Sequence, residues 1–155
     1  MADVKDLEPY AANTEGLTGV LTDIVSTMPN PIVFKVVGYV VNAFEDVTQG
    51  DVLYARASDG QVGKASAANG TLEDATVVGF ANSAALANET VKVIVVGLKT
   101  LSSLNAGDLF FLSDSTAGAI TTTPPSGAGK AVTRVGEAST TTDFAIQIEP
   151  PILLR

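Results

Sequence analysis

The chain has 155 residues, and none of them is cysteine, histidine or tryptophan. Without cysteine the protein forms no disulfide and offers no thiolate. Without histidine it lacks the side chain that most often serves as a general base or a zinc ligand. We therefore predict no catalytic residues, no metal and no cofactor, and we do not expect an enzyme.

Positive charge is scarce as well. Nine Lys and Arg stand against seventeen Asp and Glu, which gives a net charge of −8, and no two of the nine cations are adjacent. Nucleic-acid binding depends on clustered cations that displace counterions from phosphates, and an anionic membrane surface attracts basic segments. The sequence therefore predicts neither nucleic acid nor a membrane as a partner.

Long apolar runs are missing too. The most apolar stretch, PIVFKVVGYVV at residues 31–41, contains Lys35 and is far shorter than the roughly 20 residues of a membrane-spanning helix. The first ten residues, MADVKDLEPY, are acidic and have no apolar core, so we expect no signal peptide. These observations predict a soluble protein made in the cytoplasm.

What the chain does contain is a repeat. Three glycine landmarks recur 57 residues further along, and they are Gly50 with Gly107, Gly70 with Gly127, and Gly79 with Gly136. Each copy then ends in a strand-like segment, TVKVIVVG at residues 90–97 and DFAIQIEP at residues 143–150. There the offset changes by a few residues, which a loop of different length explains. We interpret the pattern as an internal duplication.

Both copies have the character of β-structure. The segments DVLYARA and DLFFLSD have the β-branched and aromatic content of strands, and Asp59-Gly60 and Asn69-Gly70 are turn signals. We predict an all-β fold in which two tandem related β-units form a compact barrel or sandwich. The expected parts are an N-terminal arm at residues 1–30, a first β-unit at 31–97, a second β-unit at 98–150 and a C-terminal tail at 151–155.

Each unit opens a strand with Gly-Asp, at Gly50-Asp51 and at Gly107-Asp108. We interpret the pair as the turn into the strand, with the Asp side chain capping nearby backbone N–H groups. A metal site is the less favoured interpretation, because the dense Asp and Asn spacing of a calcium loop is absent.

The segment LTGVLTDIVSTM, at residues 17–28, has the periodicity of one helix face. Its apolar positions are Leu17, Val20, Leu21, Ile24, Val25 and Met28. Gly16, Gly19 and several β-branched residues lower its helix propensity, so an extended arm is the alternative. The segment either packs on the protein's own β core or docks on a neighbouring subunit or a larger partner.

The second unit resembles a module of structural proteins from tailed bacteriophages. The resemblance rests on residues 106–148, where Gly-Asp and an apolar strand are followed by ITTTPP and VGEA. In those proteins it looks like a β-module of capsid decoration (cement) proteins, head fibres or tail fibres. The first unit departs from the pattern, because KASAANG replaces the Thr-Pro run.

The resemblance implies a virion structural protein that binds the major capsid protein at subunit junctions on the outer capsid surface. It also implies a homotrimer that is made in the host cytoplasm, and it transfers no single functional residue. A tail-fibre or baseplate component is the alternative within the same class. An alternative from another class is a carbohydrate-binding β-module, for which only Tyr10, Tyr39 and Tyr54 are available as tyrosine platforms.

The residues that we expect at the partner interface are apolar and lie near the two ends of the sequence. They are Leu17, Val20, Leu21, Ile24, Val25, Met28, Ile152, Leu153 and Leu154. Modest contacts of this kind become strong when several are joined in one oligomer. The alternative interpretation places the same side chains in the protein's own core.

Overall fold

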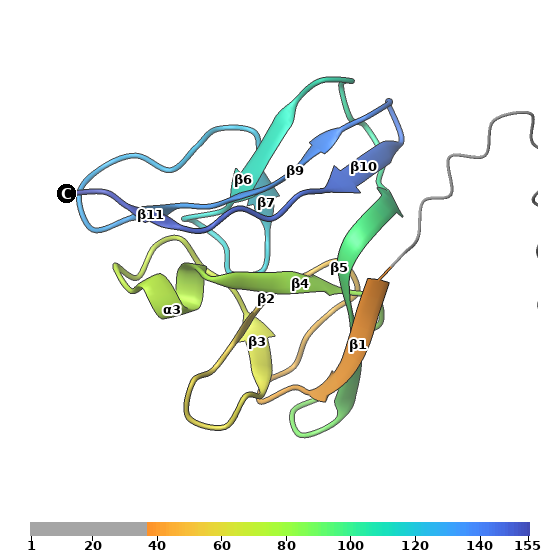
Figure 1. Cartoon of the computed structure of the whole chain (residues 1–155), viewed down its shortest axis with the longest axis vertical. Helices are drawn as coiled ribbons and strands as arrows, with labels where there is room; N and C mark the ends of the chain where they lie inside the picture. Colours follow the sequence, from red (N-terminus) through yellow and green to blue (C-terminus); the bar gives the residue numbers. More distant parts are fainter. Residues whose placement is uncertain (1–36) are drawn as a thin grey trace, which may run out of the picture. The chain divides into compact units, whose positions relative to one another are not determined.

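The computed structural model describes residues 37–155, in which antiparallel β-strands dominate (Figure 1). The strands are β1 (Val37–Asn42), β2 (Val52–Ala55), β3 (Val62–Lys64), β4 (Val77–Ala81), β5 (Thr90–Thr100), β6 (Leu109–Leu112), β7 (Ile120–Thr121), β8 (Ala131–Val132), β9 (Arg134–Ala138), β10 (Asp143–Ile146) and β11 (Ile152–Leu153). Among the described residues the one helix is α3 (Leu72–Ala75). The predicted all-β class is confirmed.

One long sheet holds nine of the strands. Its order is β3-β2-β4-β5-β10-β9-β6-β7, with β1 paired to β5 beside this path, and the sheet curls into a half-barrel (Figure 1). β8 and β11 form a separate two-stranded sheet. β5 joins the two halves, because it pairs with β1 and β4 and then, through residues 97–100, with β10. It therefore runs through the predicted boundary between residues 97 and 98.

The strands follow the predicted duplication. β2 and β6 begin 57 residues apart, and so do β4 and β9. Both β2–β4 and β6–β9 contain a register shift at the same relative position, between Leu53 and Tyr54 in one and between Phe110 and Phe111 in the other. The two units therefore share a local irregularity as well as their strand order, which agrees with a duplication.

The last strand of each unit shows the expected change of offset. Val93 pairs with Ala81 in the first unit, and Phe144 pairs with Ala138 in the second. The strand partners are thus 51 residues apart, while the strands they pair with are 57 apart. The connection before β10 is therefore six residues shorter than the one before β5, as a loop of different length requires.

One glycine of each unit is required by the close approach of the next strand. A Cβ atom on Gly79 would lie 2.5 Å from the carbonyl oxygen of Ile94, and one on Gly136 would lie 2.2 Å from that of Ala145. Both carbonyls belong to the neighbouring backbone, so neither can move aside cheaply. The glycine landmarks at this position therefore mark a packing constraint, which explains why both copies carry them.

The Gly-Asp pairs make the turns into β2 and β6, as predicted. Their glycines have φ of +100° and +91°, the region that glycine enters without steric cost. In the first unit the Asp51 carboxylate accepts a hydrogen bond of 2.8 Å from the backbone N–H of Thr48. In the second unit the Asp108 carboxylate accepts from the side-chain amide of Asn105 instead, so the predicted backbone cap occurs in one copy.

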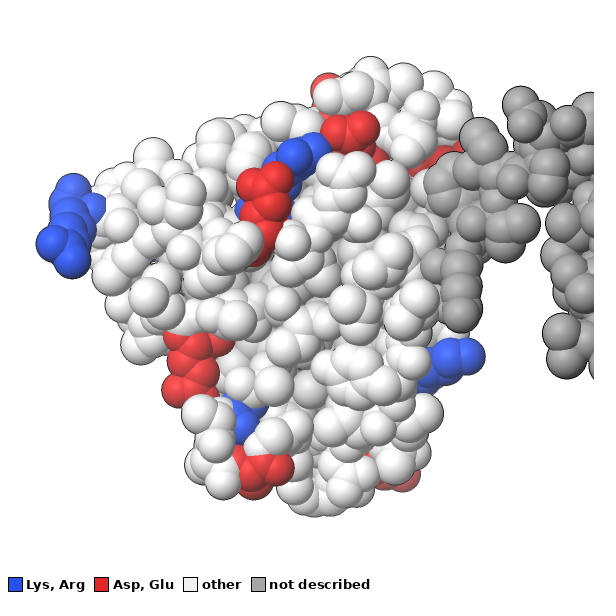
Figure 2. All heavy atoms as spheres, viewed as in Figure 1, with Lys and Arg blue, Asp and Glu red and all other residues white. Residues whose placement is uncertain are grey.

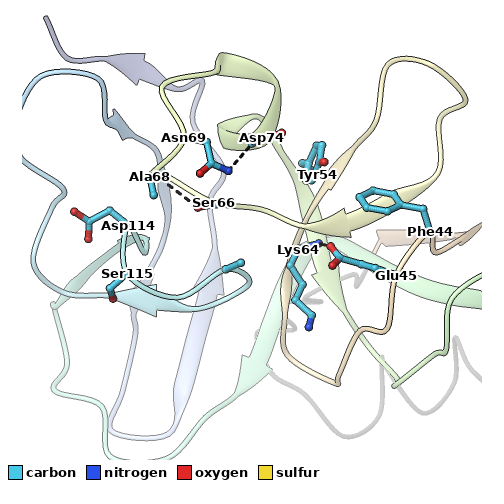
Figure 3. Close-up of a pocket in the computed structure, with 11 residues that line it drawn as sticks. Phe44, Glu45, Tyr54, Lys64, Ser66, Ala68, Asn69, Asp74, Asp114 and Ser115 are labelled. Atoms are coloured by element: carbon cyan, nitrogen blue, oxygen red, sulfur yellow. Dashed lines mark hydrogen bonds between the residues drawn. The ribbon is translucent and has the colours of Figure 1, made fainter.

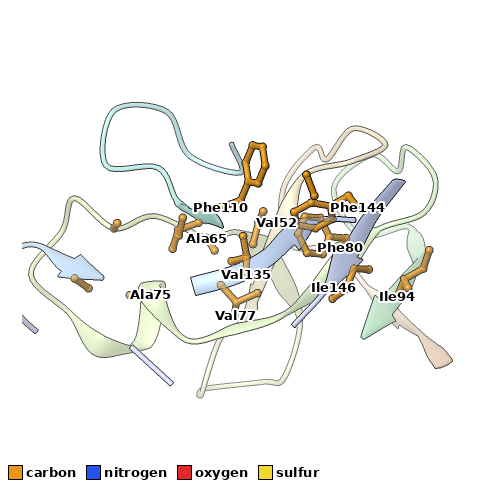
Figure 4. Packing of buried hydrophobic residues seen from close by; sticks show 14 of the residues in the cluster. Val52, Ala65, Ala75, Val77, Phe80, Ile94, Phe110, Val135, Phe144 and Ile146 are labelled. Carbon is orange, nitrogen blue, oxygen red and sulfur yellow. The ribbon is translucent and has the colours of Figure 1, made fainter. Parts of the chain in front are cut away.

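Most of the buried side chains belong to one core that both units build, which we call the shared core (Figure 4). At its centre Phe144 contacts Phe80 and Phe110 edge to face, with ring centroids 5.6 and 5.5 Å apart. A smaller core, the first-unit core, consists of Ala43, Val47, Leu53, Val62, Ala81, Ala85, Val91 and Val93. The second unit has no counterpart of this smaller core among the described residues.

The two units stack head to tail, so that equivalent faces have different neighbours. Leu53 lies in the first-unit core, whereas its counterpart Phe110 lies in the shared core. Conversely, Val52 lies in the shared core, whereas its counterpart Leu109 is 42% exposed. The second unit therefore turns one face of its strands towards the first unit and leaves the other face outside.

Hydrogen bonds between the units reinforce this stacking. The Val52 N–H donates to the carbonyl of Gly118, and the Ala131 N–H donates to that of Ala67. The buried Thr133 hydroxyl donates to the carbonyl of Ala75 at 2.8 Å. Both units accordingly fall in one compact unit, Phe34–Arg155.

The two terminal segments of the prediction have different outcomes. The arm at residues 1–30 lies outside the described residues. The tail carries β11, which pairs with β8, and the Leu154 N–H donates to the carbonyl of Lys130 at 2.8 Å. Within residues 37–155 no helix has the length and apolar character to cross a membrane.

Candidate functional site

The predicted interface residues divide into two sets. Those at positions 17–28 lie outside the described residues. On the tail, Ile152 is 65% exposed, while Leu153 and Leu154 are half-buried. Ile152 is therefore the member of the described set that presents most apolar surface.

A larger exposed apolar surface lies on β1 and β5, and sequence reasoning did not single it out. We call it the apolar strip, and it consists of Val37, Val40 and Val96, which are 47%, 65% and 51% exposed. Val37 and Val96 are direct partners in the β1–β5 ladder, so their side chains lie on the same face of the sheet. Tyr39, on the other face of β1, is also largely exposed.

The position of β1 in the sheet explains this exposure. Among the described residues β1 pairs with β5 alone, so it is an edge strand. Edge strands usually carry a charge or a proline that discourages pairing with another chain, but β1 reads VGYVVN and has neither. The sequence signal was present in the long apolar run, yet the run alone does not say which of its residues lack a neighbour.

Charged side chains are also sparse on one broad face of the protein. In Figure 2 they lie mostly towards the margin of the view, and the middle, over β2 and β4, carries none. Ion pairs hold several of the charges, including Arg134 with Glu137 and Glu149. A surface with few free charges can approach another protein surface with little desolvation cost.

A polar pocket of about 480 Å³ is the most developed hollow of a different kind (Figure 3). Its lining consists of Phe44, Glu45, Tyr54, Lys64, Ser66, Ala68, Asn69, Asp74, Asp114, Ser115 and Ala117. Figure 3 shows Asp114 and Ser115 on one side of the hollow, with Phe44, Glu45 and Lys64 on the other. The pocket therefore takes side chains from both units, and only the folded pair of units forms it.

Hydrogen bonds within the pocket hold its polar groups in place. The amide of Asn69 donates to Asp74 at 3.0 Å, and the backbone N–H of Lys64 donates to Glu45 at 2.7 Å. The ammonium of Lys130 pairs with Asp114 from outside the lining.

The pocket also shifts the titration of two of its groups. Burial raises the pKa of the Tyr54 phenol, and the carboxylates of Asp74, Glu45 and Glu73 raise it further. The hydrogen bond from Lys130 lowers the pKa of Asp114. Tyr54 therefore stays a protonated hydrogen-bond donor at neutral pH, while Asp114 stays ionised.

A second pocket, of about 490 Å³, lies in the second unit. It is lined by Leu101, Ser102, Ser103, Leu104, Asn105, Asp108, Phe110, Ile120 and Thr122. Leu101 and Ser102 stand 57 residues after Phe44 and Glu45, so the two pockets use related positions. The second pocket has one carboxylate and no tyrosine, which makes it a natural comparison for the first.

Neither pocket has the parts of a metal or nucleophilic site. In the part of the chain that the structure describes, no three acidic side chains come close enough together to hold a metal ion. The sequence supplies no histidine to activate the serines and threonines of the pockets. The arrangement is suited to binding through hydrogen bonds and apolar contact.

Comparison with known proteins leaves these surfaces as the basis for inference. No protein-family model matches the chain, and no curated protein matches it.

Proposed function

We propose that the protein is a capsid decoration (cement) protein of a tailed bacteriophage. In this role it binds the major capsid protein at subunit junctions on the outside of the shell and stabilises the shell, acting as a homotrimer. The observation that carries the proposal is the apolar strip on an uncharged edge strand, Val37, Val40 and Val96. The resemblance of residues 106–148 to phage structural modules supports it independently.

The energetics of such a contact fit a repeated structural role. Complete burial of an aliphatic side chain contributes about 1.5–3 kcal/mol, so three half-exposed valines contribute only a few kcal/mol per subunit. Joined in a trimer, contacts of this strength act together and hold far more firmly than any one of them. The proposal therefore needs no single strong site, and the exposed Ile152 on β11 offers a further contact.

Binding to empty shells tests the proposal. The purified full chain is mixed with expanded, undecorated capsids of the encoding phage, and bound protein is measured by co-sedimentation and cryo-electron microscopy. We expect Val40→Glu to lower capsid occupancy at least about tenfold, because the contact would bury an unpaired carboxylate. Leu86→Glu is the matched control, since Leu86 is 61% exposed and lies outside the strip.

The outcomes separate the proposal from its nearest rival. Binding of the wild-type chain to tails or baseplates, with none to capsids, would assign it to a tail-fibre or baseplate role. Equal loss of binding in Val40→Glu and Leu86→Glu would show that the strip is not the contact. Thermal melting of both variants checks that each remains folded.

A further inference from the structure

We infer that the polar pocket is a binding site for a neutral saccharide. The inference goes beyond capsid binding and does not rest on it, because the pocket and the apolar strip share no residue. The volume of about 480 Å³ lies within the roughly 300–1,000 Å³ typical of small-molecule sites.

The lining supplies the kinds of group that sugar hydroxyls need. Carboxylates at Asp74 and Glu45 accept hydrogen bonds, the phenol of Tyr54 and the amide of Asn69 donate them, and Ser66 does both. Because Asn69 is bound to Asp74, and Glu45 to the Lys64 N–H, these groups are already oriented. Oriented groups lose little conformational freedom when a ligand binds.

The charges of the pocket argue against an anionic ligand. Glu45, Asp74 and Asp114 all line it, and the only cation in the lining is Lys64. Lys130 neutralises Asp114 from outside, which leaves two carboxylates against one ammonium. A phosphate or carboxylate ligand would therefore be repelled, whereas an uncharged ligand would not.

The aromatic side chains argue against a cationic ligand. The Arg56 guanidinium already lies over the ring of Phe44, 4.3 Å from its centroid, where an amine would otherwise be held by its attraction to the ring. The ring also packs closely on Gly63, since a Cβ there would fall 2.1 Å from it. Phe44 is thus fully used within the protein, and Tyr54, which meets it edge to face, is the ring left to contact a ligand.

The duplication adds an internal comparison. The counterparts of Phe44, Glu45 and Tyr54 in the second unit are Leu101, Ser102 and Phe111. The second unit thus lacks the carboxylate and the phenol, although its pocket has nearly the same volume. Saccharide binding is therefore expected in the first pocket and not in the second.

Nuclear magnetic resonance of the full, ¹⁵N-labelled chain tests the inference. The chain is titrated with maltotriose, cellotriose and chitotriose at millimolar concentrations, first at low and then at high salt. We expect saturable shifts at the backbone amides of Lys64, Asn69 and Ser115 with at least one trisaccharide. The shifts should be independent of salt, because the ligand carries no charge.

Two asparagine variants localise the effect. Asn69→Ala removes the pocket's amide donor and should weaken binding about tenfold. Asn105→Ala is the matched control, because it removes the other Asn–Asp hydrogen bond, that of the second pocket. It should leave the affinity unchanged, and the unperturbed part of each spectrum shows that the variant is folded.

Three results would overturn the inference. The first is the absence of saturable shifts in the pocket with all three trisaccharides. The second is an affinity that Asn69→Ala and Asn105→Ala change equally. The third is salt-sensitive binding of spermidine to the pocket by a chain that ignores the saccharides, which would make the site one for amines. None of these results bears on binding to capsids, so the two proposals can fail separately.

Discussion

Single residues in this protein are constrained mainly by backbone approach. Gly79 and Gly136 sit where a neighbouring carbonyl leaves no room for a methyl group, while Gly127 has open space around it and φ of +101°. The sequence shows all of them as equal landmarks of a repeat. Only the structure separates a glycine needed for lack of space from one needed for its backbone conformation.

This difference predicts an order of stability among glycine variants. Gly136→Ala should destabilise the fold by about 2–3 kcal/mol, because the added Cβ meets the backbone of Ala145. Gly127→Ala should cost only about 1–2 kcal/mol, since its penalty is limited to a left-handed backbone conformation. Urea denaturation of the two variants measures both values. A larger loss for Gly127→Ala than for Gly136→Ala would contradict the steric explanation.

At the scale of elements, much could be predicted from local patterns and the rest depended on packing. The Gly-Asp turns and the strands that follow them were predictable, because turn chemistry and β-propensity are local. The helix α3 was not, although Glu73 and Asp74 in its first turn suit a helix start. The exposure of β1 and the polar pocket were also missed, because both depend on which distant segments lie beside them.

The tail shows what a short element contributes. β11 pairs with β8, and the backbones of Leu154 and of residues 129 and 130 are joined by two further hydrogen bonds. Deleting residues 151–155 should therefore lower the free energy of unfolding by about 2–3 kcal/mol, at about 1 kcal/mol for each net hydrogen bond lost. Calorimetric melting measures the change. Removing only the exposed Arg155 is the control, and an equal effect of both truncations would show that β11 is not the cause.

At the scale of the whole molecule, the two units have the same strands but opposite surroundings. Phe80 and Val77 of the first unit lie in the shared core, whereas their counterparts are Glu137 and Arg134. Arg134 pairs with Glu137 and Glu149, so charge covers the face of the second unit that corresponds to a buried one in the first. This charge marks where the stacking of units stops.

Restoring the apolar residues should therefore create a new contact. The double variant Arg134→Val with Glu137→Phe reproduces the pattern of the first unit beside the already exposed Leu109. We expect concentration-dependent self-association, because the variant exposes a continuous apolar patch. Sedimentation velocity measures it, with Thr123→Phe as a control that adds one aromatic ring on a loop. An unchanged sedimentation coefficient for the double variant would refute the idea that charge ends the stack.

The head-to-tail stacking also affects how the chain reaches its folded state. The buried bond from Thr133 to Ala75 spans 58 residues, and Phe80 has its aromatic partner at Phe144. Contacts so distant in sequence form slowly, because a long loop must close first. During synthesis the first unit therefore waits, with an apolar face uncovered, until the second has left the ribosome. That interval is when the nascent chain is most prone to aggregation and most dependent on chaperones.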